Sequence, residues 1–175
     1  MKELGVEIIK VGSAQVTHLN LIEEVASYNL PVIMSTGMST IEEIDTAVEI
    51  FKTNKTDLTL MHCTSCYPCS YENINLRIIP ILKERYKVPV GFSGHYSSVG
   101  IDAAAVAIGA TCIERHFTLD RTMKGTDHSS SLEPAGMEKV IKYIRATEQA
   151  MGSCKKRILD CEMPARLKFC GQILS

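Results

Sequence analysis

Short apolar runs alternate with amphipathic patterns along most of this chain. The apolar runs are rich in β-branched residues and do not alternate strictly with polar residues, which is typical of strands buried on both faces. They predict strands at Val6–Val11, Val32–Ser35, Leu58–His62, Val88–Phe92 and Thr111–His116. The amphipathic and Ala-rich segments predict helices at Leu19–Tyr28, Ser39–Phe51, Ile74–Tyr86, Gly100–Gly109 and Pro134–Met151.

The ends of these helices carry local signals. Ser39 stands three residues before Glu42, a pair that predicts a capping box at the start of the second helix. The third helix is less regular, because Pro80 either kinks it or marks its first turn. The last helix begins at Pro134 and is expected to stop at Gly152. Beyond that glycine no clear element is expected.

A succession of five βα units requires a parallel sheet with helices outside it. A doubly wound sheet and a (β/α)8 barrel both satisfy that pattern. Polar residues decide between them, because they follow every strand: KVGS at 10–13, STGM at 35–38, HCTS at 62–65, SGH at 93–95 and ERH at 114–116. A barrel builds its catalytic face from all its strands, whereas an open sheet concentrates it near one crossover. We therefore predict an α/β fold, a partial TIM barrel.

Such a barrel has eight strands in about 250 residues, and only part of it is expected here. We predict a partial barrel domain over residues 1–152 and a C-terminal tail over 153–175. The sheet should have two open edges with unpaired backbone groups, so the chain on its own should self-associate or fold poorly. The missing units indicate a fragment, a truncated gene product or a chain that completes itself by association.

Composition and charge exclude several classes of function. The net charge is −1, which offers no electrostatic argument for binding nucleic acid or an acidic membrane. No apolar run approaches the ~20 residues that span a bilayer. The first residues lack the features of a signal peptide, so a cytoplasmic location is expected. An odd number of cysteines, seven, favours free thiols over a disulfide framework.

One cysteine run resembles a ligand motif but lacks two of its parts. Cys63, Cys66 and Cys69 form C-x2-C-x2-C, as in an iron–sulfur binding run. The fourth cysteine and the proline after it are missing, so ordinary thiols are the preferred interpretation.

Candidate metal ligands and acid/base groups gather between residues 90 and 128. His95 and His116 end neighbouring strands, where two neutral imidazoles can bind a divalent metal with water or substrate completing its shell. The alternative is a pair of core histidines with satisfied hydrogen bonds. Glu114 shares a strand face with His116, while Arg115 should point toward the helices. Asp127 follows in a loop, either as a site residue or as an ordinary turn aspartate.

A second group of residues suits an anion. Lys10 stands at a strand end with Ser13 close behind it, and a lysine with hydroxyls and backbone amides binds phosphate or carboxylate. The alternative is a lysine that simply pairs with an acid. Ser93 should add a hydroxyl near the same anion, and Ser65 and Tyr67 should line the pocket.

Several blocks together resemble the N-acetylneuraminate (sialic acid) synthase family. They are KVGSAQ, VIMSTGMSTIEEI, LMHCTSCYP, NLRIIPIL, VGFSGH, AVAIGATCIERHFTLDRTMKGTDHSSSLEP and CEMPARLKF, in order along nearly the whole chain. The resemblance implies a homodimeric TIM-barrel enzyme with a following antifreeze-like domain. It would condense phosphoenolpyruvate with N-acetylmannosamine, its 6-phosphate or a related amino-sugar aldehyde. The products would be a nine-carbon 2-keto sugar and phosphate.

The resemblance also implies roles for single residues. It assigns a metal, Mn²⁺ or Mg²⁺, to His95 and His116, and two imidazoles favour Mn²⁺. Glu114 and Asp127 are the catalytic candidates. The Glu114 carboxylate could orient an imidazole or handle protons near the sugar, and the alternative is a buried glutamate paired with a lysine or arginine. The resemblance implies that Asp127 contacts the sugar or a metal-bound water. Phosphoenolpyruvate and the sugar would contact Lys10, Ser13, Ser65, Tyr67 and Ser93. Two alternatives remain: a non-catalytic remnant of such a synthase, and another phosphoenolpyruvate-dependent 3-deoxy-keto acid synthase, which the long HFTLDRTMKGTDHSSSLEP block disfavours.

Overall fold

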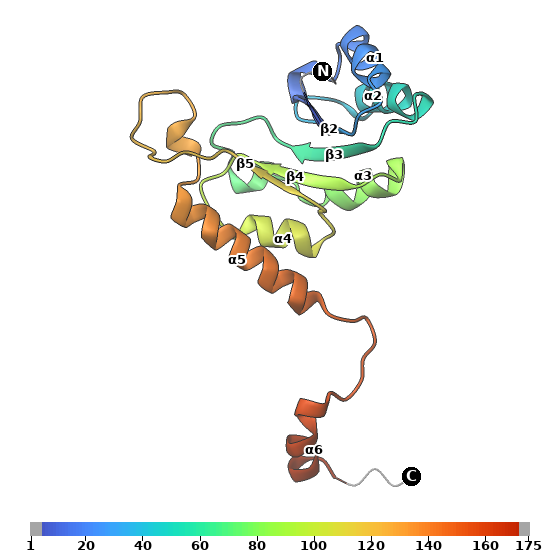
Figure 1. Cartoon of the computed structure of the whole chain (residues 1–175). Helices are drawn as coiled ribbons and strands as arrows, with labels where there is room; N and C mark the ends of the chain where they lie inside the picture. The colour runs from blue at the N-terminus through green and yellow to red at the C-terminus, as the bar shows by residue number, and fades with distance from the viewer. Residues whose placement is uncertain (1–4, 172–175) are drawn as a thin grey trace.

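A five-stranded parallel sheet forms the centre of the molecule (Figure 1). The computed structural model describes residues 5–171. The strands pair in sequence order, β1-β2-β3-β4-β5, as an arc of a barrel requires, with no reversal of the kind that defines a doubly wound sheet. The prediction of a partial α/β barrel is therefore confirmed. The strands span Ile9–Val11, Val32–Ser35, Leu58–Cys63, Val90–Gly94 and Ile113–Arg115.

Two prolines explain why β1 and β4 begin later than predicted. β1 covers only Ile9–Val11, because its partner strand β2 follows Pro31, which has no amide to donate to the ladder. β4 begins at Val90 rather than Val88, since Pro89 contributes only its carbonyl, which accepts from the Leu60 amide at 3.0 Å. β5 is also shorter than predicted.

Five helices lie outside the sheet at the expected places. They are α1 Leu19–Ser27, α2 Ile41–Thr53, α3 Ile78–Tyr86, α4 Ile101–Ala107 and α5 Pro134–Met151. A sixth helix, α6 Met163–Phe169, follows where none was expected. The capping box of α2 uses Thr40 and Glu43, so the predicted pair, Ser39 and Glu42, is wrong by one residue. Pro80 lies in the first turn of α3. The backbone N–H groups of a first turn have no acceptor within the helix, so the missing N–H of proline breaks no hydrogen bond there.

The core lies between the sheet and the helices that cover it. Its largest fully buried side chains include Phe51 of α2, Leu60 of β3, Ile79 of α3 and Phe92 of β4. α5 packs mainly against α4 and buries only Val140 completely. Because α1 to α4 shield the outer face, the opposite face and the strand ends remain available for a site.

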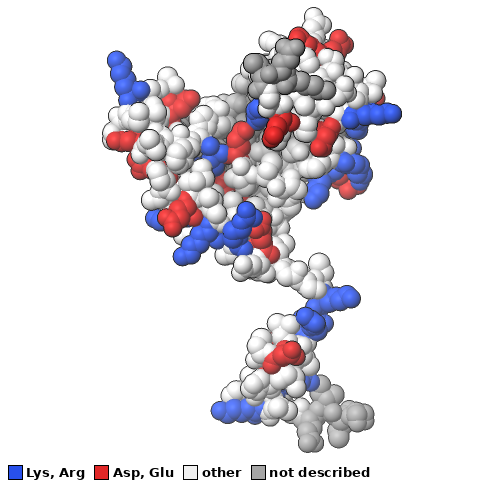
Figure 2. Space-filling model, viewed as in Figure 1, with Lys and Arg blue, Asp and Glu red and all other residues white. Residues whose placement is uncertain are grey.

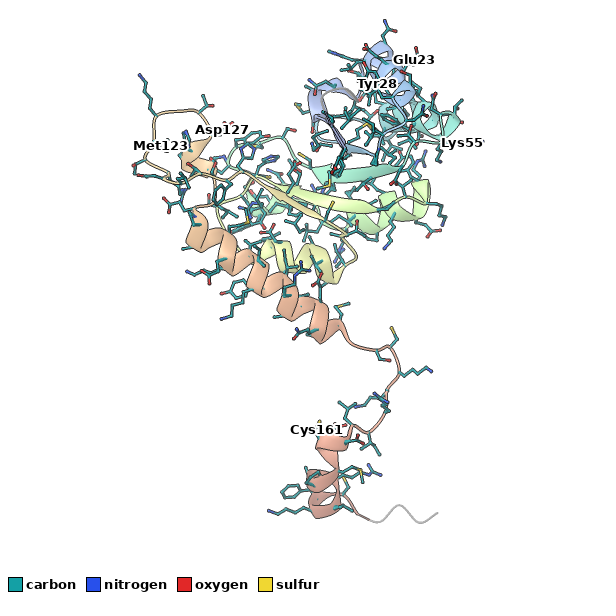
Figure 3. All side chains as sticks on the ribbon, viewed as in Figure 1. Glu23, Tyr28, Lys55, Met123, Asp127 and Cys161 are labelled. Carbon is teal, nitrogen blue, oxygen red and sulfur yellow. The ribbon has the colours of Figure 1, made fainter. Side chains whose placement is uncertain are left out.

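Beyond α5 the chain leaves the body of the molecule (Figure 1). An extended segment leads to α6, so the expectation of no clear element after Gly152 is wrong. Cys161 lies at the start of this terminal unit, far from the sheet (Figure 3). The division into a domain over 1–152 and a tail over 153–175 stays a prediction.

Candidate active site

Polar residues from every strand end line one cavity of about 400 Å³. Parallel strands place all their carboxyl ends at one edge, and the curl of the sheet turns these ends toward one another. The sequence-predicted site residues that line the cavity are Lys10, Ser13, Ser65, Tyr67, Ser93, His95, Glu114 and His116. The structure therefore brings together every predicted site residue except Asp127.

A hydrogen-bonded network crosses the cavity from the first strand to the last. Lys10 Nζ donates to Ser35 Oγ at 2.7 Å and lies 3.4 Å from Glu114 Oε2. Ser93 Oγ donates to the other carboxylate oxygen of Glu114 at 2.7 Å. The lysine does pair with an acid, but both side chains face the cavity and keep 38% and 43% of their area exposed. This ammonium group is therefore accessible to an anionic ligand.

The two predicted metal ligands lie side by side. Gly94 pairs with Arg115 in the sheet, so His95 and His116 are the next residues along their strands, with ring centroids 5.2 Å apart. His95 Nδ1 lies 3.1 Å from the Thr64 carbonyl. Because a carbonyl only accepts, this nitrogen carries the proton and Nε2 keeps its lone pair. Burial lowers the pKa of His95, which favours the neutral ring.

Tyr67 covers this histidine pair. Its ring centroid lies 4.1 Å from that of His95 and 5.5 Å from that of His116. Burial, with smaller contributions from the negative charges around it, raises the pKa of the phenol. Tyr67 therefore stays protonated at neutral pH and keeps a hydroxyl that can both donate and accept.

Asp127 lies on the long loop between β5 and α5, outside the cavity lining (Figure 3). Its Oδ2 is 3.9 Å from His116 Nδ1, too far for a hydrogen bond, and its side chain is 60% exposed. The neighbouring His128 instead bonds to Thr118 within the same loop, at 2.7 Å. A catalytic role for Asp127 remains a prediction.

The structure adds cavity residues that were not predicted as site residues, above all Ser35 and Cys63. Ser35 ends β2, and that strand-end position was the signal that could have identified it. Gly37 follows, and its amide donates to Ser13 Oγ at 3.1 Å. A side chain on Gly37 would overlap Ser65 Oγ and lie 2.9 Å from Ser13 Oγ, so the cavity has no room for one at this position.

The donor set suits a metal that keeps part of its shell for other ligands. Within residues 5–171, no three His, Cys, Asp or Glu side chains come together as a metal site. The imidazoles of His95 and His116 therefore form a pair without a third protein ligand of these types. Neutral nitrogen ligands suit Mn²⁺ when water or substrate oxygens complete the coordination. The residues present therefore fit the expected ion.

Charge on the surface is mixed. On the face shown in Figure 2, basic and acidic side chains are interspersed over the body of the molecule. No helix in the described part of the chain is long and apolar enough to cross a bilayer.

The curled parallel sheet and its polar strand ends place this protein in the TIM-barrel class. A family model described as NeuB family matches residues 1–156, and the chain belongs to this family. It is 38% identical over 170 residues to N-acetylneuraminate-9-phosphate synthase of Homo sapiens, which covers 97% of this chain and 47% of that protein. It is 39% identical over 165 residues to N,N'-diacetyllegionaminic acid synthase of Campylobacter jejuni, over 93% and 49% of the two chains.

A solved structure is similar over almost the whole chain. The N-acetylneuraminic acid synthetase of Leptospira borgpetersenii superposes with a TM-score of 0.87 at 37% identity, over 96% of this chain and 60% of that one. The chain spans about half the length of the curated relatives it matches.

Proposed function

We propose that this chain carries part of the active site of a synthase that condenses phosphoenolpyruvate with an amino-sugar aldehyde. In this reaction C3 of phosphoenolpyruvate bonds to the aldehyde carbon, whose oxygen takes up a proton. Water adds at C2 and phosphate leaves, giving a 2-keto sugar acid. One observation carries the proposal. Lys10 contacts Ser35 and Glu114, and Glu114 in turn accepts a hydrogen bond from Ser93. His95 and His116 line the same cavity.

Lys10 is the proposed anchor for the phosphate or carboxylate of phosphoenolpyruvate. Its ammonium group is held at the cavity by Ser35, and Ser13 adds a second hydroxyl nearby. Charge-assisted hydrogen bonds to an anion are about twice as strong as neutral ones. Binding of the anion would replace the 3.4 Å contact between Lys10 and Glu114.

Glu114 is the proposed acid/base group. Release from Lys10 leaves one carboxylate oxygen open to substrate, while Ser93 keeps the other oxygen oriented at 2.7 Å. The protonated Tyr67 hydroxyl and Ser65 also line the cavity, where they can bind hydroxyls of the sugar. Asp127 belongs to the proposal as a group near the sugar, next to His116.

His95 and His116 would hold a divalent ion, for which we favour Mn²⁺ over Mg²⁺. When bound there, the ion supplies Lewis acidity that polarises the aldehyde carbonyl. The proposal includes a homodimer and a cytoplasmic location. The names of the relatives support an amino-sugar acceptor as a class.

An assay of phosphate release tests the proposal. The purified chain is incubated with Mn²⁺, phosphoenolpyruvate and, in separate reactions, N-acetylmannosamine, its 6-phosphate or a diacetylated diamino analogue. We expect release that needs both substrates, stops with a chelator, and yields a product with the mass of the 2-keto sugar.

The variant Glu114→Gln should lose this activity. Glu148→Gln, which removes an acid from a surface ion pair with Arg145, should keep it. No release with any acceptor, in a chain that melts cooperatively, would contradict an active enzyme and favour a non-catalytic remnant.

A further inference from the structure

The ladder between β4 and β5 ends just before the proposed metal ligands. Gly94 and Arg115 are its last pair, and His95 and His116 are the residues that follow on each strand. Beyond the ladder, the His95 carbonyl accepts from Cys69 and the His116 carbonyl from Leu132. Neither of these two bonds joins one histidine segment to the other. A side-chain contact between the two segments would therefore help to fix the distance between the two rings.

The side chain of Arg115 makes that connection. It points away from the cavity, as the alternation along β5 predicts, and reaches under the segment that follows His95. Its Nη2 donates to the Tyr96 carbonyl at 2.6 Å and its Nη1 to the Ser98 carbonyl at 3.1 Å. The guanidinium also lies 4.2 Å from the centroid of the Tyr96 ring. The residue before His116 thus holds the residues after His95.

Asp102 completes this arrangement from the first turn of α4. Its Oδ2 accepts from Arg115 Nη1 at 2.7 Å, and the two side chains are only 0% and 2% exposed. A guanidinium has a rigid planar fork of donors, so a carboxylate on one side fixes where the remaining N–H groups point. The acid therefore orients the arginine toward the two carbonyls.

We infer that Arg115 and Asp102 are positioning residues that set the spacing of His95 and His116 for metal binding. The inference rests on the proposed metal site at these histidines. Partners that orient metal ligands typically change metal affinity by about 10–100-fold when they are removed. Neither side chain touches substrate or metal in this role, because neither lines the cavity.

The test needs a variant that keeps the fold. Removing one member of a buried pair leaves an uncompensated charge, whereas replacing both with apolar side chains of similar volume is often neutral for stability. The double variant Asp102→Leu/Arg115→Met is therefore appropriate. Asp45→Leu/Arg85→Met is a matched control, because Asp45 and Arg85 form an exposed pair beside Tyr86, away from the cavity.

Mn²⁺ affinity is measured by electron paramagnetic resonance on the full chain, with a thermal melt to confirm folding. We expect about 10–100-fold weaker binding in the Asp102/Arg115 variant and native affinity in the control. Native affinity in a folded Asp102→Leu/Arg115→Met chain would overturn the inference. If that variant does not fold, Arg115→Lys replaces it, since lysine keeps the charge but lacks the planar fork.

A metal-free measurement separates this inference from the proposed function. Failure of the native chain to bind Mn²⁺, or native binding by His95→Ala, would defeat the metal site itself. The ring ¹⁵N signals of a histidine-labelled chain without metal then test the positioning. We expect the His95 signals to show the Nδ1-protonated tautomer in the native chain, where Nδ1 faces the Thr64 carbonyl. In the Asp102/Arg115 variant these signals should shift and broaden, because the segment after His95 loses its bonds to Arg115 and the ring no longer keeps one position against that carbonyl. Unchanged His95 signals in that variant would overturn the inference.

Discussion

Lys10 on the first strand and Glu114 on the last strand of the sheet approach to 3.4 Å, Nζ to Oε2. Side chains on opposite edges of a flat five-stranded sheet would be far apart, because neighbouring strands lie about 4.8 Å from each other. The contact is therefore possible only because the sheet is curled, so that its two edge strands lie around a common cavity. It also pairs the proposed anion anchor with the proposed acid/base group before substrate arrives.

Lys10→Met should weaken the binding of phosphoenolpyruvate by about 10–100-fold, because one charge-assisted hydrogen bond to the anion is lost. Isothermal titration calorimetry measures this change. Lys87→Met is the control and should leave affinity unchanged, since Lys87 pairs with Glu84 at the exposed C-terminal end of α3. Equal affinities for the native chain and Lys10→Met would remove Lys10 from the binding site.

Gly37→Ala should damage the cavity and leave the fold intact. The added methyl group would overlap Ser65 Oγ and crowd Ser13 Oγ, so we expect a loss of about 1–3 kcal/mol in the free energy of unfolding. Phosphoenolpyruvate affinity should fall by about tenfold or more, which corresponds to ~1.4 kcal/mol. Chemical denaturation and calorimetry give the two quantities. Gly100→Ala, whose methyl would meet nothing nearer than 3.9 Å, should change neither.

Asp45 should make stability depend on pH in the acid range. Hydrogen bonds from Arg85 and Tyr86 lower the pKa of its carboxyl from 3.8 to about 2. The unfolded chain therefore binds this proton more readily, so the contribution is complete above the unfolded pKa and is lost as pH falls toward 2. Asp45→Asn should be less stable than the native chain at pH 7, and the difference should narrow below about pH 4.

Urea denaturation at a series of pH values measures this effect. Glu148→Gln is the reference for an ordinary surface pair. The free energies of unfolding of Asp45→Asn and the native chain are compared at each pH. A difference that stays constant from pH 7 down to about pH 2 would show that the charge of Asp45 is not its cause.

The open edges of the sheet should promote self-association. In the described part of the chain, β1 and β5 each pair on one side only, and the other side offers unpaired backbone groups. Sedimentation velocity should show larger species as concentration rises. Ile8→Lys, at an exposed residue next to β1, should reduce this, while Leu21→Lys on α1 should not. A monomer with one cooperative melt at every concentration would contradict the prediction.

Much of the fold could be read from local pattern. The β-branched runs, the capping signals and the order of the elements predict five βα units, because strand and helix periodicities are properties of neighbouring residues. The element limits were less accurate. Pro31 and Pro89 delay β1 and β4 through missing ladder donors, and such an effect depends on which strand pairs with which.

The candidate site was also largely predictable as a list of residues. Polar side chains at the ends of parallel strands meet at one edge, so Lys10, Ser93, His95 and His116 were expected together. Ser35 was not singled out, because nothing in its neighbours shows that its hydroxyl reaches Lys10. Asp127 was expected at the site, and the path of its long loop instead leaves it outside the cavity lining.

By itself, the sequence determined which side chains stand at strand ends and which face of β5 carries Glu114 and His116, since alternation along a strand is local. Only the tertiary structure decided that Lys10 meets Glu114, and that Arg115 reaches from β5 to the segment after His95. These distances depend on the curl and register of five strands packed against their helices. They are set by contacts between residues far apart in the chain.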